Sequence, residues 1–175
     1  RPVTTSPSFP GGVTDYVWVD RIRSTVQKTG YGAASVPTGW QTLFVPNMHQ
    51  PFGAVSDGLS NTIAIIEKGG NPNTYRLRAL TGNGDNTDGA VWSAHNCGIT
   101  FDGVDPATGM TSTSGPASQT LAMNGNNVEE VYSFHTNGCN HLFGDGSVRF
   151  INQSVQIGVY VGMLTRAGGE ANASE

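Results

Sequence analysis

Acidic and amide side chains are concentrated between residues 82 and 105, in a pattern that would suit a bound calcium ion. The segment 82–89 reads GNGDNTDG and the segment 102–105 reads DGVD. Calcium takes six to eight oxygen ligands from carboxylates, amides and backbone carbonyls. The residues that could supply them are Asn83, Asp85, Asp88, Asp102 and Asp105. The glutamate of an EF-hand loop is absent, and a surface loop built of Asx turns is the alternative interpretation.

The two cysteines, Cys97 and Cys139, also allow more than one interpretation. An even pair in a chain rich in Asn, Thr, Ser and Gly is typical of one extracellular disulfide, which we expect here. Two separate buried thiols would explain the pair equally simply. A third alternative is a zinc or copper site, because His95 stands near Cys97, and His135 and His141 flank Cys139.

Residues suited to nucleophilic catalysis are present, but not in an arrangement that predicts a reaction. Ser133 and His135 should share one strand face, Ser60 lies in a turn, and no G-x-S-x-G elbow occurs. The adjacent carboxylates Glu129 and Glu130 are expected at a solvated strand entry. We therefore expect that the chain is not an enzyme, and a hydrolase is the least favoured of the alternatives.

The composition predicts one domain over residues 1–175, and it argues against nucleic-acid binding and against a membrane-spanning segment within the sequence. Only 13% of the residues are charged, the net charge is −4, and 24 residues are glycine. Such a surface does not attract polyanions, which argues against nucleic-acid binding through phosphate contacts. The longest apolar run covers residues 63–66, far short of the ~20 residues that span a bilayer.

Short apolar segments between Gly, Pro, Asn and Asp predict a mostly β structure. The expected strands are 14–19, 42–45, 62–67, 75–80, 89–93, 131–136, 139–144 and 147–152. Two helices are expected, over 19–28 and over 154–166, the second capped by Ser154 and ended by Gly168-Gly169. The fold class is therefore α+β, mostly β, with an antiparallel sheet and long loops.

The most specific structural prediction concerns residues 131–152, which read VYSFHTNGCNHLFGDGSVRFIN. Asn137-Gly138 and Asp145-Gly146 are typical of two-residue hairpin turns, which predicts a three-stranded meander. Side-chain alternation then gives a core face that carries Tyr132, Phe134, His141, Phe143, Val148 and Phe150. The opposite face carries Ser133, His135, Asn140, Leu142, Arg149 and Ile151. His135 and Asp145 fall at opposite ends of the ladder, so they should not form a catalytic pair.

Four ordered blocks of the chain resemble a known family. His135 is followed by nine residues and then Asp145-Gly146, and upstream the run DGLSNT at 57–62 leads to Glu67. With GVTDY at 12–16 and LTRAGGE at 164–170, these blocks resemble the H-x9-DG family of planctomycete prepilin-like proteins, domain of unknown function 1559. The motif residues, to which we assign structural roles, are His135, Asp145, Gly146, Asp57, Gly58, Ser60, Asn61, Glu67 and Arg166. Asn137-Gly138 and Leu59 depart from the residues common in that family.

The resemblance implies a pilin- or pseudopilin-like globular head at the cell surface, outside the cell or in the periplasm. Members of the family begin with a prepilin-like leader and a long hydrophobic helix, which the sequence does not show, so we expect a processed or truncated form. Contact with a membrane is expected only through that helix. The resemblance implies no reaction. We expect a structural protein that packs against copies of itself or other surface proteins, and a calcium-braced module that binds a glycan or protein is the alternative.

Two further expectations concern single side chains. Glu67 ends an apolar strand, so its carboxylate should pair with Arg149 or Arg166. The tryptophans Trp18, Trp40 and Trp92 could stack on a sugar or fill the core, and Trp92, in an apolar segment, is expected in the core.

Overall fold

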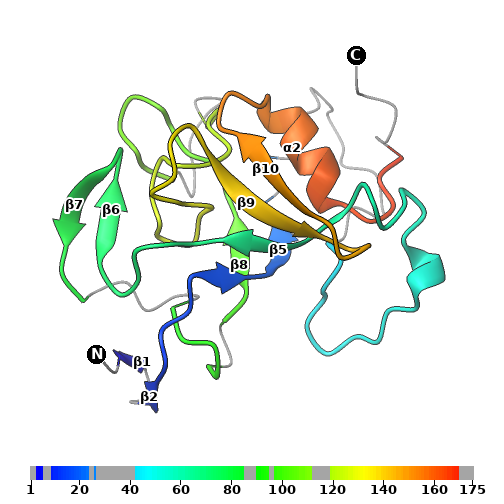
Figure 1. Cartoon of the computed structure of the whole chain (residues 1–175), viewed down its shortest axis with the longest axis horizontal. Helices are drawn as coiled ribbons and strands as arrows, with labels where there is room; N and C mark the ends of the chain where they lie inside the picture. Colours follow the sequence, from blue (N-terminus) through cyan, green and yellow to red (C-terminus); the bar gives the residue numbers. More distant parts are fainter. Residues whose placement is uncertain are drawn as a thin grey trace.

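The structure is a computed structural model, and it describes residues 3–5, 9–23, 26, 42–84, 90–94, 97–111 and 119–169. Its centre is a four-stranded antiparallel sheet in the order β10-β9-β5-β3 (Figure 1). The strands are β3 (Tyr16–Val17), β5 (Ile63–Glu67), β9 (Gly138–Phe143) and β10 (Val148–Asn152). The described chain is mostly β with one α-helix, α2 (Ile157–Leu164), which confirms the expected α+β class.

Smaller strand pairs surround this sheet. They are the antiparallel pairs β1 (Val3–Thr5) with β2 (Phe9–Gly11) and β6 (Thr74–Arg76) with β7 (Ala79–Gly82), and the parallel pair β4 (Val19–Ile22) with β8 (Ile99–Phe101). β4 occupies the start of the segment that was expected to be helical. It is a strand because Val19 and Ile22 are buried beside β8, a strand that the sequence pattern did not indicate.

Three of the expected strands contribute only isolated bridges. These bridges are Thr42 with Thr165, Val13 with Val91, and Lys68 with Tyr132. The expected strand 75–80 is divided by a turn, in which Leu77 and Arg78 have φ values of 45° and 68°. Positive φ is costly for such side chains. The Leu77 amide donates to the Gly125 carbonyl at 2.7 Å, and Arg78 Nη2 donates to the His135 carbonyl at 3.1 Å, which holds the turn in place.

The β9–β10 hairpin has a register one residue away from the expected one. The Phe143 amide donates to the Ser147 carbonyl at 2.9 Å, and Val148 lies opposite Leu142 rather than Phe143. The loop therefore has three residues, 144–146, with Gly146 at φ 86° in the manner of a G1 bulge. Because a one-residue shift turns every side chain of a strand over, Val148 and Phe150 are exposed, and the prediction that they are core residues is wrong.

The first expected hairpin does not form. Residues 131–136 make a single bridge, at Tyr132, and Asn137-Gly138 leads directly into β9. Tyr132 is buried as expected, but Phe134 is 58% exposed, so its predicted core position is also wrong. β9 pairs instead with β5, whose isoleucines supply the apolar partner that the expected strand was assumed to supply.

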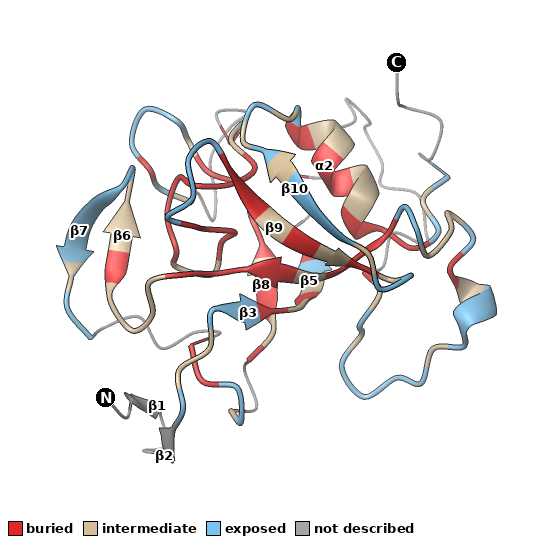
Figure 2. Cartoon of the chain, viewed as in Figure 1, coloured by how far each residue is buried: buried red, intermediate tan, exposed pale blue. Residues whose placement is uncertain are grey.

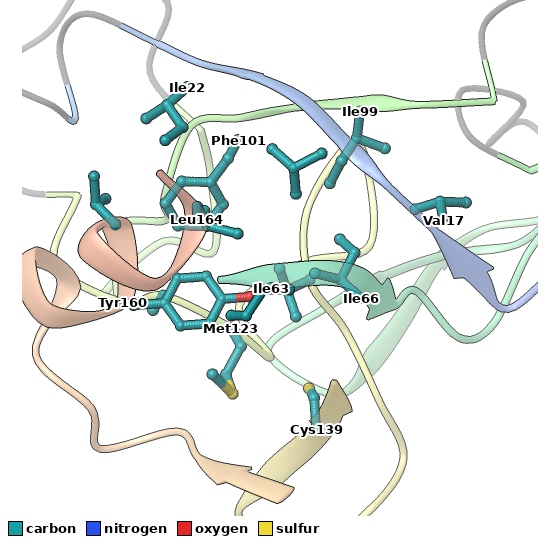
Figure 3. Packing of buried hydrophobic residues seen from close by; sticks show 14 of the residues in the cluster. Val17, Ile22, Ile63, Ile66, Ile99, Phe101, Met123, Cys139, Tyr160 and Leu164 are labelled. Atoms are coloured by element: carbon teal, nitrogen blue, oxygen red, sulfur yellow. The ribbon is translucent and has the colours of Figure 1, made fainter. Parts of the chain in front are cut away.

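The core lies between the sheet and α2. Ile157, Tyr160, Val161 and Leu164 are the buried residues of the helix, spaced as one apolar stripe, and they pack with residues of β5, β8 and β9 (Figure 3). The helix begins after Gln156 rather than after Ser154, and it ends at Leu164, where the C-cap residue Thr165 is extended. Trp92 does not join this core: it is 67% exposed, so the expectation of a buried position is wrong.

Candidate functional site

The family-motif residues gather in two places, of which the first is the loop 57–62. The Asp57 carboxylate accepts from the amides of Gly168 at 2.8 Å and Gly169 at 3.1 Å, just after α2. The side-chain amide of Asn61 donates to the Asp57 carbonyl at 2.8 Å, and Gly58 has a positive φ of 92°. Asp57 therefore anchors the segment after the helix, whereas Ser60 is exposed.

The Asp145-Gly146 turn docks on the same loop. The Gly144 amide donates to the Thr62 carbonyl at 2.9 Å, and the Asp145 amide donates to the Leu59 carbonyl at 3.2 Å. The Asp145 carboxylate accepts from the amide and hydroxyl of Ser147, which lowers the pKa of this carboxyl. These contacts join the Asp145-Gly146 turn to the loop 57–62, and the structural roles assigned to the Asp-Gly motifs remain a prediction.

Asp57 provides a direct test of this anchoring. We expect Asp57→Ala to lower the free energy of unfolding by about 2 kcal/mol, because two amides lose a charged acceptor. Asp105→Ala is the matched control: its carboxylate accepts from Ala107, two residues along the chain, so a smaller loss is expected. Urea denaturation measures both. Equal losses would show that Asp57 does no more than shape its own turn.

The second motif cluster joins Glu67 to His135. Glu67 Oε1 lies 3.3 Å from His135 Nε2, and Glu67 Oε2 accepts from the Asn140 amide at 2.8 Å. Glu67 therefore pairs with a histidine and a backbone amide rather than with the expected arginine. Arg166 donates instead to the Thr42 carbonyl at 3.0 Å. His135 thus contacts Glu67, while Asp145 contacts Ser147 and Arg149, in keeping with the expectation that His135 and Asp145 are not partners.

Glu67 and His135 resemble the acid and base of a catalytic triad, but the neighbouring Ser133 hydroxyl contacts the backbone of His135 and not its ring. Ser133 is buried, and its Oγ accepts from the His135 backbone amide at 2.8 Å. Glu130 is fully buried, so the prediction that it lies at a solvated strand entry is wrong. Burial, and the nearby Asp102 carboxylate, raise the pKa of Glu130 well above its usual range.

The predicted disulfide is wrong, because Cys97 and Cys139 are both free and buried. They belong to one apolar cluster without being bonded to each other. Burial raises the pKa of both thiols, most strongly that of Cys139. His141 is buried, and its two ring nitrogens are hydrogen-bonded to Tyr160 Oη at 2.9 Å and to the Cys139 carbonyl at 3.0 Å, so neither nitrogen is oriented toward a metal. His95 lies outside the described residues.

The calcium candidates are placed only in part. Asp102 is buried and paired with Arg23, Asp105 Oδ1 accepts from the Ala107 amide at 2.8 Å, and Asn83 is exposed. Asp85 and Asp88 lie outside the described residues. Within the described ranges, no group of three or more His, Cys, Asp or Glu side chains could hold a metal ion. Calcium binding by the five residues together remains a prediction.

The feature that the sequence pattern missed is an exposed apolar face of the four-stranded sheet. Cross-strand partners share a face, and the observed pairs are Tyr16 with Glu67, Ile65 with Leu142, Val148 with Leu142, and Phe150 with Asn140. We call these residues the outer face: Tyr16, Ile65, Glu67, Asn140, Leu142, Val148 and Phe150. Val148 is 68% exposed and Phe150 51%, and Figure 2 shows that β10 is largely exposed.

A groove extends the outer face beyond Leu142. It has a volume of about 420 Å³, and its walls include Phe44, Met48, Phe52, Leu142 and Gly144. Phe52 lies in the short 3₁₀ helix η1 (Phe52–Ala54) and is 78% exposed. Figure 1 draws the loop with η1 in cyan, on the right of the molecule. A contiguous exposed apolar patch often marks a contact with another molecule.

The comparison with known families places the chain. A family described as "Protein of unknown function (DUF1559)" matches residues 6–158. The chain belongs to this family. The DUF1559 match includes His135, the Asp145-Gly146 turn and the 57–62 loop, whereas Arg166 and the Gly168-Gly169 pair lie beyond its end. No curated protein and no solved structure gives a significant match. Among the described residues of this DUF1559 chain, no helix is long and apolar enough to cross a membrane.

Proposed function

We propose that this protein is a structural head domain at the cell surface, pilin- or pseudopilin-like, which packs with copies of itself or with other surface proteins. The observation that carries the proposal is the outer face with its adjoining groove, an apolar surface that the described chain does not cover. Phe52, Val148 and Phe150 are all exposed, and contiguous exposed apolar patches often mark interaction sites.

The charge of the chain supports this proposal. With 13% charged residues and a net charge of −4, identical subunits repel one another weakly. On the outer face, Glu67 is paired with His135, so the carboxylate has a partner and does not oppose an apolar contact. The motif clusters bind loops to the sheet and thereby hold this surface in shape.

The test of the proposed function is whether the chain assembles. We expect sedimentation velocity to show mass that increases with concentration, and electron microscopy of native surface material to show fibres or a layer that antibodies to the chain label. Phe52→Lys should reduce assembly by at least tenfold, because it places a charge in the groove. A chain that remains monomeric at every concentration and labels no surface structure would contradict the proposal, as would a closed dimer that neither grows nor joins one.

A further inference from the structure

Within the described residues, the free edge of the four-stranded sheet is β10, and its hydrogen bonds to β9 show which way its backbone groups point. The Ser147 carbonyl accepts from Phe143 at 2.9 Å, and the Gln153 amide donates to Asn137 at 2.8 Å, so both residues face β9. Backbone groups alternate along an antiparallel strand. The amides and carbonyls of Val148 and Phe150 therefore point away from β9, out of the sheet.

In the part of the chain that the structure describes, this edge lacks most of the features that prevent strand pairing. Natural edge strands are usually short, strongly charged, interrupted by proline or covered by another segment. β10 has five residues, no proline and a single charge, Arg149, whose Nη2 lies 3.6 Å from Asp145 Oδ2 of the same turn. The opposite edge, β3, has only two residues. The sheet thus offers one long edge, with exposed apolar side chains along it.

We propose that β10 pairs in antiparallel fashion with β10 of a second copy, with Phe150 on the two-fold axis. This interface rests on the proposed function and specifies one contact of the assembly. The partner that fits best is a short, nearly neutral, apolar strand, and β10 is itself such a strand. The pairing is isologous, because the same surface is used on both copies.

Charge selects the register. An axis at Arg149 would place two guanidinium groups directly opposite each other, which is unfavourable. An axis at Phe150 places Arg149 opposite Ile151 of the second copy and Val148 opposite its Asn152, so all five residues of the strand are paired. The two Phe150 rings then meet on the outer face, where each is already exposed.

Cysteine cross-linking tests this register. In a hydrogen-bonded pair the two Cα atoms are about 5.5 Å apart, which suits a disulfide. We expect Phe150→Cys to give a covalent dimer under mild oxidation through the introduced thiol. Both native cysteines are buried and should not compete with it. Val148→Cys is the control: its counterpart lies four residues, about 13 Å, along the strand, and should not cross-link. Cross-linking of neither variant, or of both at equal rates, would overturn the proposal.

A second pair of variants distinguishes the role of the β10 interface in assembly from the role of the groove. Phe150→Lys should weaken the dimer at least tenfold in sedimentation equilibrium, whereas Phe52→Lys should leave the dimer intact while preventing larger assemblies. If Phe52→Lys abolishes assembly and Phe150→Cys does not cross-link, the β10 pairing is wrong and the proposed function stands. If the cross-linked dimer forms but never grows or joins a surface structure, the pairing stands and the proposed function is wrong.

Discussion

Replacing Gly138 by alanine is expected to lower the free energy of unfolding by about 3 kcal/mol, near the upper end of the cost of overpacking. A methyl group on Gly138 would lie 2.7 Å from two atoms of the Phe150 ring and closer still to the Ile151 carbonyl oxygen. A flexible ring can move aside, but a backbone carbonyl in the neighbouring strand cannot. The variant must therefore push β9 and β10 apart at the end of their ladder.

The control is Gly53→Ala. Gly53 lies in η1, and a methyl group added there would have no atom within 4 Å, so we expect a change of less than about 0.5 kcal/mol. Urea denaturation followed by far-UV circular dichroism measures both variants. A midpoint for Gly138→Ala equal to that of the wild type would contradict the observed β9–β10 register, since the two strands would then not approach at Gly138.

The position of Gly138 also shows why a hairpin turn at Asn137-Gly138 was predicted wrongly. Asn-Gly is a strong hairpin signal because both residues tolerate positive φ, and Asn137 does have φ 64°. Gly138, however, is needed for space rather than for conformation, because the Ile151 carbonyl passes so close. The two-residue turn with two positive φ values lies instead at Leu77-Arg78, where contacts with Gly125 and His135 override local preference. Such contacts are made across long sequence separations and leave no local signal.

The strands of the sheet were predicted more accurately than its exposed surface. Residues 62–67, 139–144 and 147–152 were all expected to be strands, and each matches a strand of the structure to within one residue. The exposed surface was predicted wrongly because of the length of one loop. The loop between β9 and β10 has three residues rather than two, so each side chain of β10 lies on the face opposite to the predicted one. The apolar outer face could therefore not be found from the pattern, because alternation alone assigns Val148 and Phe150 to the core.

The sequence pattern predicted the burial of one of two buried ionisable groups. Alternation placed His141 on the core face, and it is buried, whereas Glu130, which was expected in solvent, is fully buried as well. Glu130 Oε1 accepts from the Asp102 amide at 2.9 Å, and Asp102 is in turn paired with Arg23. Each of these partners is distant along the chain. Their burial has measurable consequences, because a buried ionisable group makes stability depend on pH.

His141 should make the protein sensitive to acid. Burial lowers the pKa of His141 from 6.5 to about 4, so the folded state holds the neutral ring. A carbonyl can only accept a hydrogen bond, so Nδ1 carries the proton toward the Cys139 carbonyl and Nε2 accepts from Tyr160. A second proton would remove that acceptor. Below pH 6.5 the unfolded chain binds the proton first, and stability is lost as the pH falls toward 4, by about 3 kcal/mol in all.

The other ionisable groups near the His141 ring do not lower the stability as the pH falls. Arg149 lies opposite His141 in the ladder, and the raised pKa of Tyr160 keeps the Tyr160 hydroxyl protonated. Glu130 has the opposite sign: its raised pKa favours folding below its unfolded value, near 4.5, and costs stability as the pH rises above it. The wild-type profile alone therefore mixes the two groups, and a variant of His141 is needed to separate them.

The decisive comparison is His141→Gln against the wild type between pH 4 and 7, with urea denaturation at each pH. At pH 7 the variant should be less stable, because one of the two hydrogen bonds of the ring is lost. As the pH falls through the window from 6.5 to 4, the difference should shrink, since only the wild type must bury a protonated ring or unfold. His49→Gln, at an exposed position, should leave the profile unchanged. A difference between His141→Gln and the wild type that is constant with pH would mean that His141 already titrates in the folded state as it does in water, and that the core between β9 and α2 admits solvent.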